Sequence, residues 1–214
     1  MFREVNRMLI GSARKLAAGL CLSGVAFLAA PLMLIVGGLS LAVPQAVAQE
    51  VEGVDVPESL TFGDHTLTLN GAGMRTKFFV DAYIAALYLS EVSSEADAII
   101  QADAPTNIRV FITSDLITGK RFSEAVMDGF VRATHGNLGP IRVQIDTMIA
   151  TFRADMKQGD VFDLHYLPGR GTEIYRNGDL QTVAPGLDFK QAMMAIWLSE
   201  DAVQGSLRER MLAQ

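Results

Sequence analysis

Apolar and polar residues alternate along several short segments of the chain, which is the pattern of half-buried β-strands. Residues 60–69 alternate on both sides of Gly63-Asp64, a two-residue pair suited to a tight hairpin turn. Residues 74–89 are mostly β-branched, aromatic or small, and are numerous enough for two strands or one bent strand. Residues 107–113 place alternate residues on one apolar face. These segments predict a β-sheet.

A strand meander is predicted in the second half of the chain. Residues 161–167, 172–176 and 180–183 have the length and composition of strands. The first two are joined by residues 168–171, and the last two by Asn177-Gly178, which is the strongest short signal for a hairpin. We therefore expect three antiparallel strands in succession here.

Between these strands the period of the pattern changes to that of an α-helix. From Phe122 to Ala133, apolar residues recur at intervals of three and four, which predicts an amphipathic helix with one buried stripe. The same spacing predicts helices over residues 141–157 and 189–198, and shorter helices ending near Gln101 and Leu212.

Together these elements predict an α+β fold in which an antiparallel β-sheet has helices packed on one face, an open-faced β-sandwich. Residues 50–58, rich in Val and acidic side chains and ended by Pro57, are interpreted as a leader before the first strand. If the other face of the sheet is open, the remaining hairpin and loops can roof it to form an apolar cleft.

The N-terminal segment has the layout of a secretory signal. Four basic residues and one acidic residue lie between residues 3 and 15, and no charged residue occurs from Leu16 to Val43. Small residues at Ala46 and Ala48 suit signal peptidase, so cleavage is expected after Ala48. Residues 1–48 are thus predicted to be a signal peptide and residues 49–214 one periplasmic domain.

The alternative is that the 28 uncharged residues 16–43 are retained as a membrane helix, because about 20 residues suffice to span a bilayer. Pro31, Gly37, Gly38 and Pro44 interrupt this stretch, and the cleavage site follows at the expected place. We therefore favour cleavage, with any membrane contact made through the N-terminal segment.

Charge and composition argue against two classes of function. Without residues 1–48 the chain keeps 14 basic and 23 acidic residues, and such a surface repels nucleic-acid phosphates. The one cysteine, Cys21, lies in the predicted signal peptide. His65, His135 and His165 are far apart in the sequence, without the spacing of metal ligands, so neither a metal site nor a cofactor is expected.

Five segments, in the same order along the chain, resemble the chalcone isomerase-like family. They are residues 70–77 (NGAGMRTK), 83–89 (YIAALYL), 118–124 (TGKRFSE), 168–172 (PGRGT) and 189–198, which ends in Ile-Trp-Leu. The resemblance covers almost all of the chain after residue 48, and it implies the family's fold. It does not specify an activity.

In the plant enzymes of this family, a phenolate oxygen of the substrate attacks its own enone, and the reaction needs a cation and hydroxyl groups around the ketone. The resemblance places the family's arginine at Arg75, its threonine at Tyr83, its tyrosine at Phe122 and its asparagine at Gly129. Phe122 and Gly129 have no polar side-chain atom, so no catalytic residue is assigned with assurance, and efficient chalcone cyclisation is not expected.

The same residues fit the fatty-acid-binding branch of the family, in which an arginine and a tyrosine hold a carboxylate and an apolar cavity holds the tail. We therefore expect a small apolar ligand such as a fatty acid, bound by Arg75, Tyr83 and Phe122. The alternatives are an isomerase of the chalcone type, with Arg75 and Tyr83 as its catalytic groups, and a ligand-free interaction module whose cleft is filled by its own side chains.

Two conditions make this hypothesis checkable. Eight residues of one extended strand span roughly 26 Å, so Arg75 and Tyr83 meet only if the chain doubles back between them. A half-buried arginine also needs an anion, which is either a ligand or an internal carboxylate such as Asp81, Asp115 or Glu124.

Overall fold

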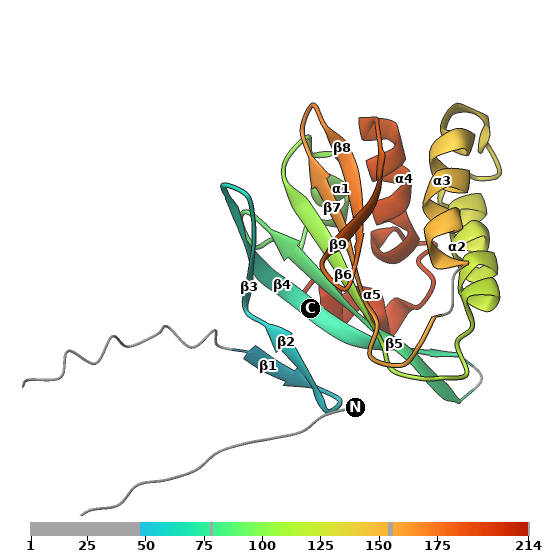
Figure 1. Ribbon diagram of the computed structural model, residues 1–214. Coiled ribbons are helices and arrows are strands. Elements are labelled where there is room, and N and C mark those ends of the chain that lie inside the picture. Colours follow the sequence, from blue (N-terminus) through green and yellow to red (C-terminus); the bar gives the residue numbers. More distant parts are fainter. Residues whose placement is uncertain (1–47, 78, 154–155, 214) are drawn as a thin grey trace, which may run out of the picture. The chain divides into compact units, whose positions relative to one another are not determined.

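The computed structural model describes residues 48–77, 79–153 and 156–213, and within them seven strands form one antiparallel sheet in sequence order (Figure 1). Each strand pairs with the next along the chain. The strands are β3 (Ser59–Phe62), β4 (His65–Lys77), β5 (Val80–Leu89), β6 (Thr106–Ile112), β7 (Val161–Leu167), β8 (Gly171–Arg176) and β9 (Asp179–Ala184).

The turn residues named from the sequence do form the hairpins. Gly63 has a φ of 57° in the β3–β4 turn, and Asn177 and Gly178 have φ values of 53° and 87° in the β8–β9 turn. Two-residue hairpin turns favour residues that tolerate positive φ, which explains glycine and asparagine at these positions. The segment 74–89 forms parts of two strands, β4 and β5, and does not form one bent strand.

Helices cover one face of the sheet, as predicted for this α+β fold (Figure 1). They are α1 (Ala96–Gln101), α2 (Gly119–Ala133), α3 (Arg142–Phe152), α4 (Leu187–Leu198) and α5 (Gly205–Met211), with a short 3₁₀ turn at Gly139–Ile141 before α3. Alternate residues of β5, β6 and β7 point toward these helices and form the main apolar core with them. This burial fixes the register of the strands, because a shift by one residue would expose the apolar face.

The helix α5 packs closely against β4. A Cβ atom at Gly71 would lie 2.1 Å from the carbonyl oxygen of Arg210, and one at Gly73 would lie 2.9 Å from the Arg210 side chain. These two glycines therefore allow the backbones to approach. The NGAG segment is explained here by packing, and it positions the part of β4 that contains Arg75.

The opposite face of the sheet is partly covered by a segment that the sequence analysis interpreted as a leader. Residues 50–58 are not a leader: β1 (Ala48–Val51) and β2 (Val54–Pro57) form a separate hairpin. Val51 and Val56 from this hairpin pack with Leu60, Ile84 and others in a second apolar cluster. The hairpin and the first strands of the sheet thus cover part of this face with a core of their own.

One predicted helix is shorter in the structure, and nearly all of the predicted signal peptide lies outside the described residues. The helix predicted over residues 141–157 ends at Phe152, although Met156 is buried in the same core. Residues 1–47 of the predicted signal peptide lie outside the described residues, and β1 begins at Ala48, the residue after which cleavage is expected. Among the helices of the described residues, none has the length and apolarity needed to cross a membrane.

Candidate functional site

A cavity of about 680 Å³ lies on the helix-covered face, between the end of the β4–β5 hairpin and helices α2 and α4. This volume is within the range of small-molecule sites. Its lining is largely apolar and comprises Val80, Ala82, Tyr83, Leu116, Ile117, Phe122, Ala125, Val126, Ile196, Trp197 and Val203, with Arg75, Lys77, Arg121, Glu124, Asp128 and Arg132 as the charged members. From the sequence, a cleft was expected on the other face of the sheet if that face was open, whereas this cavity lies on the helix-covered face.

The reason is the alternation of side chains along β5. Ile84, Ala86 and Tyr88 contribute to the cluster beneath the β1–β2 hairpin, whereas Tyr83 packs against the core formed with the helices. Successive side chains point to opposite faces of a strand, so Tyr83 and its neighbours on that face point toward the helices. The strand pattern alone does not indicate which face the helices cover.

Arg75 and Tyr83 lie directly opposite each other in the pairing of β4 with β5. The chain doubles back between them through the β4–β5 turn, which satisfies the first geometric condition set by the sequence. Both side chains are half-buried and both line the cavity. An arginine and a tyrosine eight positions apart in sequence are therefore adjacent in space.

The hydroxyl oxygen of Tyr83 accepts a hydrogen bond of 3.1 Å from the indole Nε1 of Trp197. Burial raises the pKa of Tyr83, while Trp197 and the nearby Arg75 act in the opposite direction. The phenol is therefore neutral near pH 7. Because its oxygen accepts from Trp197, its proton is left to donate to an acceptor in the cavity.

Arg75 has no internal carboxylate partner among the described residues. Its Nη1 donates to two neutral oxygens, the Oε1 atom of Gln204 at 2.9 Å and the carbonyl of Thr76 at 2.5 Å. Of the carboxylates considered from sequence, Asp81 accepts from the Thr76 hydroxyl at 2.8 Å, and Asp115 from the Gln158 backbone. The cation is thus hydrogen-bonded but not neutralised.

Gln204, just before α5, is a residue of the site that sequence reasoning missed. Its Oε1 accepts from Arg75 and from the backbone N–H of Thr76, and its Nε2 donates to the Met74 carbonyl and the Ser206 hydroxyl. All its polar atoms are used, so its amide holds the Nη1 atom of Arg75 in place. No local sequence pattern predicts this contact between Gln204 and Arg75, which are 129 positions apart in the chain.

Phe122, the third predicted site residue, is 5% exposed and lines the same cavity. Its ring makes an edge-to-face contact with Tyr83 at 5.9 Å and another with Phe152 at 5.0 Å. Trp197 also lines the cavity. Phe130, Met193 and Met194 are buried core residues and are not part of the lining.

Gly129, the position matched to the family's asparagine, has a different task. A Cβ atom there would lie 2.9 Å from Cγ2 of Ile196, so the glycine lets α2 approach α4. Thr118 caps α2 by accepting a hydrogen bond from the Arg121 backbone N–H at 3.3 Å. Neither residue lines the cavity.

The charged residues around the cavity favour an anion. Four of those in the lining are basic and two are acidic, in a chain whose net charge is −6. Lys77, Arg121 and Arg132 are exposed, whereas Arg75 lies deeper beside Tyr83. The site therefore combines an outer group of cations with one inner cation, next to apolar walls.

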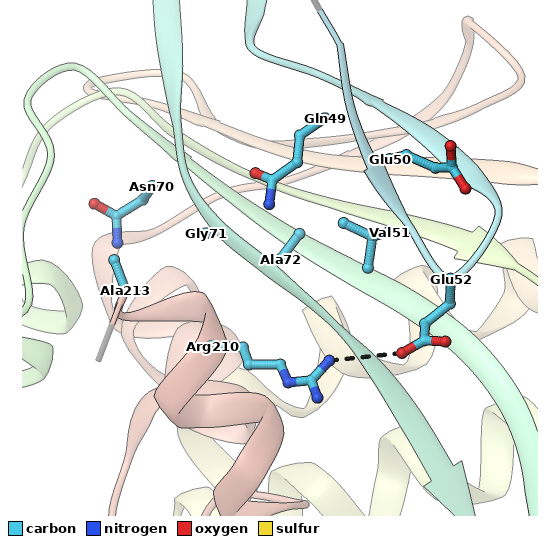
Figure 2. Close-up of a pocket in the computed structure, with 9 residues that line it drawn as sticks. All are labelled: Gln49, Glu50, Val51, Glu52, Asn70, Gly71, Ala72, Arg210 and Ala213. Carbon is cyan, nitrogen blue, oxygen red and sulfur yellow. Dashed lines mark ion pairs between the residues drawn. The ribbon is translucent and has the colours of Figure 1, made fainter.

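A second depression of about 450 Å³ lies between the β1–β2 hairpin, β4 and α5 (Figure 2). Figure 2 shows Arg210 and Glu52 facing each other across it, with an N···O distance of 3.8 Å. Asn70 already donates to the carbonyls of Ser93 and Met211. Arg210, Glu52 and Asn70 are thus engaged within the protein, and we do not assign a ligand to this depression. Nowhere in the described part of the chain do three or more metal-ligating side chains gather.

Comparisons with known proteins agree with this architecture. A profile of a family described as "Chalcone isomerase-like" matches residues 48–213. A crystal structure of a fatty-acid binding protein from Arabidopsis thaliana aligns with a TM-score of 0.62 and 16% identity, over 78% of this chain and 96% of that one. At this identity the likeness establishes the fold alone. No curated protein matches the sequence.

Proposed function

This chain belongs to the chalcone isomerase-like family, and on that premise we propose that it binds an apolar carboxylate, such as a fatty acid, and does not catalyse a reaction. The observation that carries the proposal is Arg75: a half-buried cation with no carboxylate partner in the described part of the chain, opposite Tyr83 and at the edge of an apolar cavity. A carboxylate in the cavity would supply the missing anion.

The head group would be held by two kinds of donor. Arg75 offers a charged N–H group, and Tyr83 offers the proton that its bond from Trp197 leaves unused. Hydrogen bonds to a charged partner contribute about 1.5–3 kcal/mol each, more than those between neutral groups. Gln204 supports this geometry because it holds Nη1 without neutralising the guanidinium.

The tail would lie along the apolar walls that α2 and α4 present to the sheet. Phe122, Val126 and Ile196 line this part of the cavity, and the edge-to-face contacts of Phe122 fix its ring. Burial of methylene groups contributes about 0.8 kcal/mol each. Such walls favour a flexible alkyl chain. The ligand-free alternative would need a cleft filled by the protein's own side chains, so the cavity beside Arg75 supports ligand binding over that alternative.

The isomerase alternative is weaker at this site. Phe122 carries no hydroxyl to hold a ketone or a water. Gly129 has no side chain, and it lies where α2 packs closely against Ile196 of α4. The loss of one donor from a preorganised site typically costs on the order of a hundredfold in rate. Arg75 and Tyr83 could still polarise the ketone of a substrate, so a chalcone assay tests the isomerase alternative.

We also propose that the protein acts in the periplasm after cleavage behind Ala48. The support is the sequence: a basic N-terminus, 28 residues without charge and small residues at Ala46 and Ala48. N-terminal sequencing of the protein recovered from an exporting bacterial host tests this. A mature chain that starts at Gln49 is expected, and an intact N-terminus in the membrane fraction would contradict it.

The function is tested by native mass spectrometry and by displacement of a fluorescent fatty acid from the purified protein. We expect a co-purified or added long-chain carboxylate to bind, and the matching alcohol, which lacks the charge, to bind at least about tenfold more weakly. Equal affinity for acid and alcohol would contradict a role for Arg75. Turnover of a chalcone above the uncatalysed rate, followed by loss of its colour, would favour the isomerase instead.

A further inference from the structure

Trp197 is the single tryptophan of the chain, and it lines the cavity beside Tyr83. Its side chain is buried, and its indole Nε1 donates to the Tyr83 hydroxyl oxygen at 3.1 Å. An indole N–H can donate a hydrogen bond but cannot accept one. The direction of this bond is therefore fixed by the chemistry of the two groups, and Tyr83 is the acceptor.

This bond limits what the Tyr83 hydroxyl can offer to a ligand. A tyrosine hydroxyl by itself can either donate or accept a hydrogen bond. Here its oxygen faces two donors, the indole of Trp197 and the nearby guanidinium of Arg75. A ligand group with a proton to donate would compete with both for the same oxygen. Among the residues that the structure describes, the hydroxyl donates to no acceptor, so its proton is left for the ligand.

The segment after α4 holds Trp197 in the last turn of that helix. The carbonyl on each side of Trp197 accepts a hydrogen bond from this segment, one from the Val203 backbone N–H at 3.0 Å and one from the Arg208 side chain at 2.8 Å. Gln204, in the same segment, donates nothing to the indole but holds Nη1 of Arg75 at 2.9 Å. One stretch of chain therefore positions both the cation and the indole.

We propose that Trp197 is a positioning residue that makes the site specific for a head group without a proton to donate. Because it occupies the Tyr83 oxygen, it leaves Tyr83 able only to donate to the ligand. An ionised carboxylate has acceptor oxygens alone and suits this arrangement. An alcohol can accept from Tyr83, but its own proton finds no acceptor on Tyr83 or Arg75, and a buried donor left unpaired is unfavourable. This inference rests on the proposed function and names the class of head group.

The test separates hydrogen-bond direction from charge. It uses a long-chain 2-ketone and the matching 2-alcohol, which share one carbon skeleton and carry no charge, whereas only the alcohol has a proton to donate. Both ligands are titrated against a bound fluorescent fatty acid on the purified protein. We expect the wild type to bind the ketone more tightly than the alcohol. Trp197→Phe keeps an aromatic ring and removes the N–H, so its ratio of ketone to alcohol affinity should be about fivefold lower.

Two comparisons show whether the effect passes through Tyr83. Ile196→Val is the matched control, because Ile196 also lies on α4 and lines the cavity but has no polar side-chain atom. It should weaken both ligands alike and keep the ratio. In a Tyr83→Phe background, adding Trp197→Phe should leave the ratio unchanged, since the group through which Trp197 acts is gone.

A chemical variant covers the case in which Trp197→Phe does not fold. Because the chain has one tryptophan, that residue can be replaced by its benzothiophene analogue, in which sulfur takes the place of the N–H. The ring shape is kept and only the donor is lost. The ratio of ketone to alcohol affinity should fall as it does for Trp197→Phe.

The outcomes distinguish this inference from the proposed function. A ratio unchanged by Trp197→Phe would overturn the inference. So would an equal fall in Ile196→Val, or a fall that persists without the Tyr83 hydroxyl. In each of these cases a wild type that binds the fatty acid leaves the proposed function standing. A wild type that binds neither the fatty acid nor the ketone would reject the proposed function and this inference with it.

Discussion

Two arginines on opposite faces of the same sheet are used in different ways. On the face away from the helices, Arg109 forms a two-point ion pair with Asp163, with distances of 2.7 and 2.9 Å, and Asn107 also donates to Asp163 at 3.0 Å. On the helix face, Arg75 donates to the neutral oxygens of Thr76 and Gln204, and it has no ion pair with any residue that the structure describes. One cation therefore has its anion built into the fold, whereas the other has no carboxylate partner among the described residues, which supports the proposal that a ligand supplies one.

Arg109→Met should give the largest effect, because it strands Asp163, which is 4% exposed, in a poorly hydrated environment. We expect the free energy of unfolding to fall by about 3–5 kcal/mol, the usual cost of breaking a buried pair. Urea unfolding followed by circular dichroism measures it. A loss below about 1 kcal/mol would mean that Asp163 is hydrated, and the contrast with Arg75 would lose its basis.

Arg75→Met applies the same substitution to the other face and should act on binding instead of stability. No carboxylate is stranded, so the unfolding free energy of the ligand-free protein should stay equal or rise. The affinity for a fatty acid should fall by about 1.5–3 kcal/mol, roughly tenfold to a hundredfold. Thermal melts of delipidated protein and displacement titrations give both values. A large drop in melting temperature would instead indicate a structural ion pair.

The fold could be predicted further than the site could. Turn residues such as Gly63 and Asn177-Gly178 act locally, so the sequence itself specifies the hairpins. The family resemblance supplied Arg75, Tyr83 and Phe122, and the structure brings all three to one cavity. The face that bears the cavity was not predicted, because the alternation of side chains along a strand defines two faces and does not indicate which one the helices cover.

The β1–β2 hairpin and the role of Gln204 were not predicted, because both depend on contacts with distant parts of the chain. The β1–β2 hairpin has strands of four residues, too short for a clear alternation, and its valines are buried only against β3, β4 and β5. Gln204 looks like any polar loop residue, and its role depends on the distant position of Arg75. Long-range contacts of single polar side chains leave no periodic signal.

Gln204→Glu sharpens the comparison by making the Arg75 face resemble the Arg109 face. The new carboxylate would lie where Oε1 now accepts from Arg75, and it would neutralise the guanidinium. We expect fatty-acid affinity to fall by about 1 kcal/mol, roughly fivefold. Gln204→Met is the comparison variant, since it removes all the hydrogen bonds of the amide and adds no charge. Equal losses in both variants would mean that the amide only fixes geometry.

The last effect is expected from pH, is absent at pH 7, and belongs to the face of Arg109. His165 there is fully buried and stacks on Phe62 with a centroid distance of 4.0 Å. Burial lowers the pKa of His165 to about 4, and the neighbouring Glu173 and Asp163 offset part of this change.

The sign follows from proton binding. Between pH 6.5 and about 4 the unfolded chain carries a proton on His165 and the folded chain does not. The unfolding free energy should therefore fall as the pH falls through this range, by at most roughly 1.4 kcal/mol per pH unit for one proton.

His165→Phe, which can still stack on Phe62, should flatten this pH dependence of the unfolding free energy. The fatty-acid affinity at pH 7 should stay unchanged, because the cavity lies on the other face of the sheet. The measurement is a series of urea titrations at several pH values. If the variant keeps the slope of the wild type, other groups cause it, and the buried polar face does not contribute to acid sensitivity through this histidine.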